Sequence, residues 1–197
     1  LITETGLEFG AGDVVMTCGA GGALNVMMRT LMDPGDEFVI FSPFFVEYHF
    51  YADNHSGSCK VVPPDENFLP DMEAFRKTIT DKTRGVLINS PNNPTGVLYN
   101  SDVLSELSEI IREKEKEFGT EIYLVSDEPY RKLIFDDLEY PHIFDFHKRS
   151  IVATSHSKDL ALPGERIGYL AVHPSCPGKE ELIDGLVFSN RILGFVN

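Results

Sequence analysis

The sequence predicts an α/β domain of three layers, in which a mainly parallel seven-stranded sheet is covered by helices on both faces. Short apolar runs alternate along the chain with segments of helical periodicity, which is typical of parallel sheets with crossover helices. The chain has 197 residues, of which 42% are apolar, enough for one domain with a complete core. No repeat, low-complexity segment or linker divides it, so we expect residues 1–197 to form a single domain.

Seven apolar runs have the length and composition of buried strands. They comprise residues 14–17, 37–41, 58–62, 86–88, 122–125, 151–154 and 167–172. Turn-forming residues bound several of these runs. The breakers Pro91 and Pro94, for example, predict a fixed loop over residues 89–96.

The segments between the runs predict the helices. The glycine cluster 19–22 reads as a turn before a helix over residues 23–32, and a second helix is expected from residue 42 with Pro43 near its start. Asp71 is the expected N-cap of a short helix, and residues 101–117 carry a clear apolar stripe. Residues 182–192 also follow helical spacing. Because we find no capping residue after them, we expect a helix that is cut before its end.

Composition narrows the class of protein. Seventeen Lys and Arg residues against 31 Asp and Glu residues give a net charge of −14, so nucleic-acid binding is not expected. Cys18, Cys59 and Cys176 are widely spaced, and the histidines show no metal-binding spacing, which favours a reducing compartment such as the cytoplasm and no metal centre. No apolar run reaches the length of a membrane span and no signal peptide opens the chain.

Four polar clusters follow predicted strands directly. They are the glycines of residues 19–22, the pair Asn92-Asn93, Asp127 with Tyr130, and Ser155 with Lys158. The carboxyl ends of parallel strands fall along one edge, which is where open α/β sheets bind ligands. The four clusters are therefore expected to share one site.

One end of this site suits a phosphate and an aldehyde. A helix that begins at a glycine cluster offers free N–H groups to an anion, and Ser155 and Arg166 could add charge-assisted hydrogen bonds. Lysine is the side chain that forms Schiff bases with carbonyl compounds, so an aldehyde could condense with Lys158.

The other end suits an aromatic ring. Asp127 could pair with a protonated ring nitrogen, and Tyr130 and Asn93 could bind a ring hydroxyl. Phe45 or Phe44 could stack on the ring face. Phosphate, aldehyde, ring nitrogen and ring hydroxyl together describe pyridoxal 5′-phosphate.

Taken singly, these residues have ordinary structural explanations. Lys158 could be a loop charge, Asp127 a helix cap and Asn93 a turn former, whereas Tyr130 could belong to the core and Arg166 could pair with a surface carboxylate. Their agreement on one edge favours a binding site over these separate explanations. His156, which has no assigned partner, is interpreted as structural.

Three motifs carry a resemblance to a known family. They are Asn92-Asn93-Pro94-Thr95-Gly96, Ser126-Asp127-Glu128-Pro129-Tyr130, and Ser155-x-Ser157-Lys158 followed by Pro163-Gly164-x-Arg166-Ile167-Gly168. In this order and spacing the sequence resembles the large domain of the class I/II aminotransferases, the fold-type I pyridoxal-phosphate enzymes. The resemblance implies that Lys158, Asp127 and Tyr130 are catalytic.

The resemblance also implies a role for each residue of the site. Lys158 would be the Schiff-base lysine and move a proton between Cα and the cofactor C4′, and Asp127 would pair with the pyridine nitrogen. The implied contacts to the rest of the cofactor are Asn93 and Tyr130 at the 3′-oxygen, Phe45 on the ring, and Ala20, Gly21, Ser155 and Arg166 at the phosphate.

Family members are about twice as long as this chain. The resemblance therefore implies a large domain truncated at both ends, without the N-terminal arm and the C-terminal small domain. It implies a homodimer that transfers an amino group between an amino acid and a 2-oxo acid, and leaves the amino acid open. Two alternatives also remain open: a pyridoxal-phosphate β-lyase or cyclopropane-forming synthase, and a non-catalytic sensor domain like that of MocR-type regulators.

Overall fold

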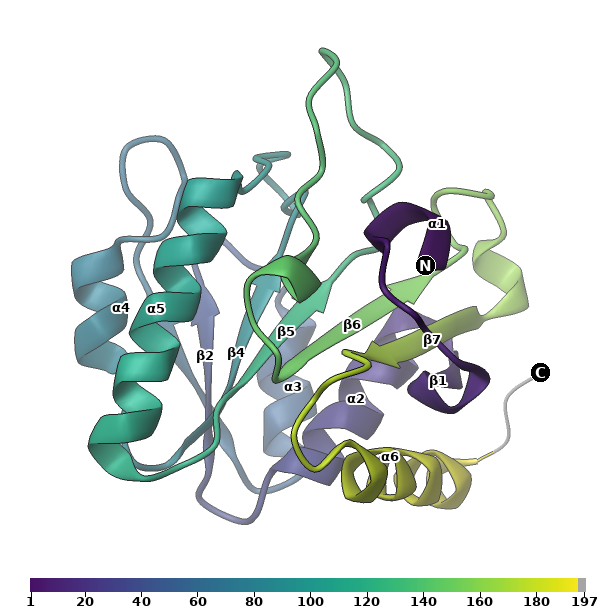
Figure 1. Cartoon of the computed structure of the whole chain (residues 1–197), viewed down its shortest axis with the longest axis horizontal. Helices are drawn as coiled ribbons and strands as arrows, with labels where there is room; N and C mark the ends of the chain where they lie inside the picture. Colours follow the sequence, from purple (N-terminus) through teal and green to yellow (C-terminus); the bar gives the residue numbers. More distant parts are fainter. Residues whose placement is uncertain (195–197) are drawn as a thin grey trace.

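The computed structural model describes residues 1–194 and confirms the predicted fold class (Figure 1). Seven strands form one sheet in the order β1-β7-β6-β5-β4-β2-β3. All pairings among β2 to β6 are parallel, and β7 runs antiparallel to both of its neighbours. The strands are β1 (Val14–Cys18), β2 (Glu37–Phe41), β3 (Ser58–Val62), β4 (Thr83–Asn89), β5 (Tyr123–Asp127), β6 (Ser150–Ser155) and β7 (Ile167–Val172). β2, β3 and β7 have the predicted bounds, β1, β4 and β6 extend beyond them, and β5 begins one residue later and ends two residues later than predicted.

Helices cover the two faces of this sheet as separate layers (Figure 1). One layer contains α2 (Gly19–Leu31), α3 (Glu47–Asp53) and α6 (Lys179–Leu193), and the other contains α4 (Met72–Thr78) and α5 (Ser101–Phe118). The remaining elements are α1 (Ile2–Thr5) and the 3₁₀ turns η1 (Ala11–Asp13), η2 (Ile143–Asp145) and η3 (Pro163–Glu165).

The central strands are apolar on both faces because each face has its own core. In β6, Ile151 and Ala153 pack with the α2 layer, whereas Val152 packs with the α5 layer. This alternation follows from the period of two along a strand. It explains why the strands read as continuous apolar runs.

Two helix starts carry the side-chain caps that the sequence favours. Asp71 accepts a hydrogen bond from the N–H of Ala74 at 2.9 Å, as predicted, and Asn100 accepts one from the N–H of Val103 at 3.0 Å. Each cap satisfies one N–H group that a helix leaves without a partner at its start.

The structure corrects three helix predictions. No helix begins at residue 42, because Ser42 continues the sheet by donating to Val62 O at 2.9 Å and α3 begins only at Glu47. α2 begins at Gly19, so the glycine cluster forms its first turn rather than a preceding turn. α6 ends at Leu193 with Gly194 as its C-cap (φ 132°), so the expectation of an uncapped last helix was wrong; residues 195–197 lie outside the described part.

No helix within residues 1–194 combines the length and apolar character needed to cross a membrane.

Candidate active site

A pocket of about 370 Å³ opens at the edge of the sheet where β4, β5 and β6 end. β1 also ends at this edge and β7 starts there, because β7 is antiparallel to both β1 and β6. The structure brings all nine residues of the predicted cofactor site to this one pocket. They are Ala20, Gly21, Phe45, Asn93, Asp127, Tyr130, Ser155, Lys158 and Arg166.

The first turn of α2 forms one wall of the pocket, and Arg166 lies against it. Gly19 has a φ of +70°, which favours glycine. A Cβ atom at Gly19 would lie 2.9 Å from Arg166 Nη2, so the missing side chain also makes room for the guanidinium. Helix N–H groups, a guanidinium and the buried Ser155 therefore line the same wall, a combination suited to a phosphate group.

Asp127 ends β5 and lies at the base of the pocket with one oxygen satisfied and one not. Its Oδ2 accepts a hydrogen bond of 2.7 Å from the hydroxyl of Tyr48, which is itself buried. Its Oδ1 is buried and has no hydrogen-bond partner among residues 1–194. Burial raises the pKa of Asp127 to about 6, and the hydrogen bond from Tyr48 opposes that rise. A buried acceptor without a partner is costly, so a protonated ligand nitrogen would fit Oδ1.

Asn89 joins the ends of β4 and β5 and orients Asn93. Its Nδ2 donates to the backbone O of Asp127 at 2.8 Å, and its Oδ1 accepts from the N–H of Asn93 at 2.6 Å. The donor and the acceptor of one side-chain amide therefore both position residues that line the pocket. The expected fixed loop after β4 is held by this contact.

Lys158 lies in the exposed loop after β6, and its amine extends back over the pocket. Its Nζ is 5.9 Å from the centre of the Tyr130 ring. Tyr130 follows β5 closely, so the neighbouring strands β5 and β6 bring the lysine and the tyrosine together. Phe45, half-buried in the segment between β2 and α3, contacts Tyr48 edge-on with ring centres 5.8 Å apart.

Some residues that line or support the pocket were not predicted from the sequence. They include Glu47, Tyr48, Tyr51 and Asn89. Tyr51 donates a hydrogen bond to Glu47, and burial raises the pKa of Tyr51. The spacing of Glu47, Tyr48 and Tyr51 is helical, but a single turn of helix does not reveal which face meets a pocket. Asn89 could have been found, because it is a polar residue at the end of a buried run.

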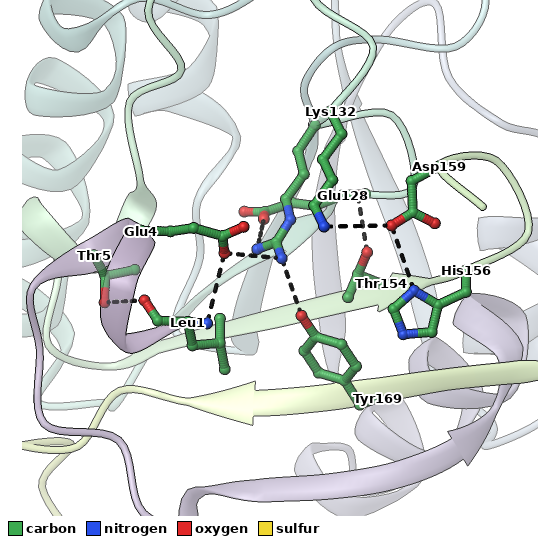
Figure 2. A network of polar contacts seen from close by, with 10 residues as sticks. Leu1, Glu4, Thr5, Glu128, Lys132, Thr154, His156, Asp159 and Tyr169 are labelled. Atoms are coloured by element: carbon green, nitrogen blue, oxygen red, sulfur yellow. Dashed lines mark hydrogen bonds and ion pairs between the residues drawn. The ribbon is translucent and has the colours of Figure 1, made fainter.

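A polar network lies beside the pocket around Arg131, which contacts Glu4, Glu128 and Tyr169. These three partners are labelled in Figure 2. Glu128 is 1% exposed. Burial raises its pKa to about 7, and the charge of Arg131 opposes this. The backbone of Glu128 is also fixed to β6, since its N–H donates to Ala153 O at 2.8 Å and its O accepts from Thr154 Oγ1 at 2.9 Å. These contacts fix the segment that carries Asp127 and Tyr130.

A second part of the network joins the loop after β6, which carries Lys158, to the turn after β5. Lys132 Nζ lies 3.6 Å from Asp159 Oδ2, and His156 Nδ1 lies 3.4 Å from the same oxygen (Figure 2). His156, interpreted from the sequence as structural and without an assigned partner, thus has Asp159 as its partner.

Comparison with known proteins identifies relatives along nearly the whole chain. The model of the family "Aminotransferase class I and II" matches residues 2–192. A probable aspartate aminotransferase of Methanocaldococcus jannaschii is 36% identical over 92% of this chain and 46% of its own length. An aspartate aminotransferase of Thermotoga maritima is 37% identical over 80% of this chain and 41% of its own length.

Solved structures give the same picture. An amino transferase from Eubacterium rectale superposes with a TM-score of 0.97 at 38% identity, covering 100% of this chain and 50% of that one. The aspartate aminotransferase of Thermus thermophilus with maleate superposes with a TM-score of 0.87 at 30% identity, covering 100% of this chain and 49% of that one. The chain therefore spans about half the length of the relatives it matches.

Proposed function

Since the chain belongs to the class I and II aminotransferase family, whose members use pyridoxal phosphate, we propose that it is the cofactor-binding large domain of such an enzyme. The enzyme would transfer an amino group between an amino acid and a 2-oxo acid. The observation that carries this proposal is the shared pocket, in which nine residues of complementary chemistry meet. The unpartnered Oδ1 of Asp127 gives independent support, because it suits a ring that carries a protonated nitrogen.

Each end of the pocket has a distinct task in this proposal. Ala20 and Gly21, through the N–H groups of the first turn of α2, would bind the phosphate together with Ser155 and Arg166. Asp127, held by Tyr48, would bind the pyridine nitrogen. Asn93 and Tyr130 would bind the 3′-oxygen, and Phe45 would cover one face of the ring.

When bound, pyridoxal phosphate supplies an electron sink for the bonds at the Cα atom of an amino acid. Lys158 would attach the cofactor through its amine. After release from the cofactor the same amine would take the proton from the substrate Cα and deliver it at C4′. Tyr130, whose ring lies 5.9 Å from Nζ, would limit the positions that this amine can take.

Other features of the proposal rest on the family rather than on the pocket. Aspartate, which names several of the relatives, is the first amino donor to test. We also propose a homodimer located in the cytoplasm, and the free thiols of Cys18, Cys59 and Cys176 support a reducing compartment.

The proposal is tested by trapping the cofactor on the chain. The protein is mixed with pyridoxal phosphate, reduced with borohydride and digested, and the modified peptide is identified by mass spectrometry. We expect the modification at Lys158, together with a visible absorption band before reduction, and we expect both to be lost in Lys158→Ala. Modification spread over surface lysines, or an unchanged band in Lys158→Ala, would contradict the proposal.

A further inference from the structure

We infer that Asp159, held by Lys132 and His156, is a positioning residue that keeps the amine of Lys158 over the pocket. The inference rests on the proposed function, in which Lys158 is the residue that attaches the cofactor. It concerns residues outside the pocket lining, since neither Asp159 nor Lys132 nor His156 contacts the cavity.

The carboxylate of Asp159 is occupied on both oxygens. Oδ2 faces Lys132 Nζ at 3.6 Å and His156 Nδ1 at 3.4 Å, and Oδ1 accepts a hydrogen bond of 2.8 Å from the N–H of Leu160. The side chain of Asp159 is only 11% exposed, whereas Lys158 beside it is exposed. Asp159 therefore points inward as an anchor, which leaves Lys158 free to reach the pocket.

Two contacts connect the turn after β5 to the loop after β6, one made by Lys158 and the other by its neighbour Asp159. The turn after β5 contains Tyr130 and Lys132 and is closed by a hydrogen bond of 2.7 Å from the N–H of Leu133 to Tyr130 O. Tyr130 lies under Lys158, and Lys132 faces Asp159. The ion pair therefore fixes the separation of the two segments at a point one residue from the reactive lysine.

The loop has few other features that would hold Lys158 in place. Its base is closed by hydrogen bonds from the N–H of His156 to Ile167 O at 3.1 Å and from the N–H of Leu162 to His156 O at 3.2 Å. Its apolar side chains Leu160 and Leu162 are 57% and 42% exposed and so bury little surface. A loop of this kind opens easily unless a polar contact restrains it.

The Lys132 side chain is 50% exposed, and ion pairs of exposed side chains add little to the stability of a fold. Loss of the pair is therefore expected to loosen the loop without unfolding the chain. Because a displacement of about 1 Å at a reacting group can slow a reaction up to about a hundredfold, the loss should still be visible in the reactivity of Lys158.

The test compares Lys132→Met, Asp159→Asn and their double variant with the native chain. Asn at position 159 keeps an acceptor for Leu160 and removes only the charge. Lys132→Arg keeps the charge, and Lys77→Met removes a matched exposed lysine that pairs with Glu73 on α4. Hydrogen exchange of the peptide covering residues 156–166 is measured without cofactor, and the rate of borohydride-trapped labelling at Lys158 is measured with pyridoxal phosphate.

We expect each single variant to exchange faster in this peptide and to label Lys158 about tenfold more slowly. The double variant should be no worse than Asp159→Asn alone, because that single change already removes the charge that Lys132 faces. Lys132→Arg and Lys77→Met should match the native chain. Unchanged exchange in Lys132→Met and Asp159→Asn would overturn the inference, as would effects that multiply in the double variant.

The two readouts separate this inference from the proposed function. A native chain that never labels at Lys158 contradicts the proposed function, and the exchange result then still decides whether Asp159 holds the loop. Normal labelling of the native chain with equal labelling and exchange in the variants rejects the inference alone.

Discussion

At Asp127, the burial that suits the residue to a ligand also lowers the stability of the fold when the carboxyl group ionises. Burial raises its pKa to about 6 in the folded chain, whereas the pKa of an aspartate in an unfolded chain is about 3.9. Between these values the folded chain binds the additional proton. Stability linked to Asp127 is therefore fully present at low pH and is lost as the pH rises through about 6.

Asp127→Asn is therefore expected to stabilise the cofactor-free chain at pH 8 by about 1–3 kcal/mol, because asparagine cannot ionise. At pH 4 the two chains should be nearly equal. Urea unfolding at both pH values measures the difference, with Asp184→Asn, an exposed change on α6, as the control. The same substitution should weaken binding of pyridoxal phosphate, since the proposed partner of the ring nitrogen loses its negative charge. A variant that is less stable at pH 8 would contradict the assigned pKa.

The sequence indicates those site residues whose type and position suggest a role even when their contacts are unknown. Lys158 and Asp127 stand out because each is a charged group within four residues of the end of an apolar run. Tyr48 could not be predicted in this way, because its role depends on the hydrogen bond that its hydroxyl donates to Asp127, 79 positions along the chain. The same holds for Asp159, because its partner Lys132 lies in a separate segment of the chain.

At the scale of elements, the pocket depends on the close approach of β7 to β6 and to the start of α2. A Cβ atom at Gly168 would lie 2.5 Å from Thr154 O and 2.7 Å from the carbonyl carbon of Gly19. Both are backbone atoms, which cannot move aside as a flexible side chain can. Gly168 therefore sets the position of the helix start that would bind the phosphate.

Gly168→Ala is expected to lower the free energy of unfolding by about 1–3 kcal/mol, as overpacking does, and to weaken cofactor binding by displacing α2. Gly12→Ala is the control, because a Cβ atom there meets nothing within 4 Å. Thermal unfolding and a titration with pyridoxal phosphate measure the two effects. Equal stability of the two variants would mean that β7 is not held as described.

Element prediction was accurate where the local pattern and the tertiary environment agree. The strands were found because burial on both faces leaves only apolar residues in them. The helix expected from residue 42 failed because Ser42 forms a sheet contact with Val62 that periodicity cannot reveal. The end of α6 was missed because Gly194, which caps it, was not recognised as a stop signal.

For the molecule as a whole, the pocket exists only when six of the seven strands are in place. Its lining runs from Ala20 to Arg166 and draws on segments next to β1, β2, β4, β5, β6 and β7. No partly folded chain that lacks one of these strands presents the same set of groups. A ligand of this pocket therefore binds the folded state alone and must stabilise the entire domain.

Pyridoxal phosphate at one hundred times its dissociation constant is expected to raise the free energy of unfolding by about 2.7 kcal/mol, the value for a ligand that binds only the folded state. Urea unfolding followed across a range of cofactor concentrations measures the dependence. Pyridoxal without its phosphate should stabilise less at equal concentration, because the first turn of α2, Ser155 and Arg166 then lack their ligand. An unfolding midpoint that does not move with cofactor concentration would show that the folded chain does not bind the cofactor.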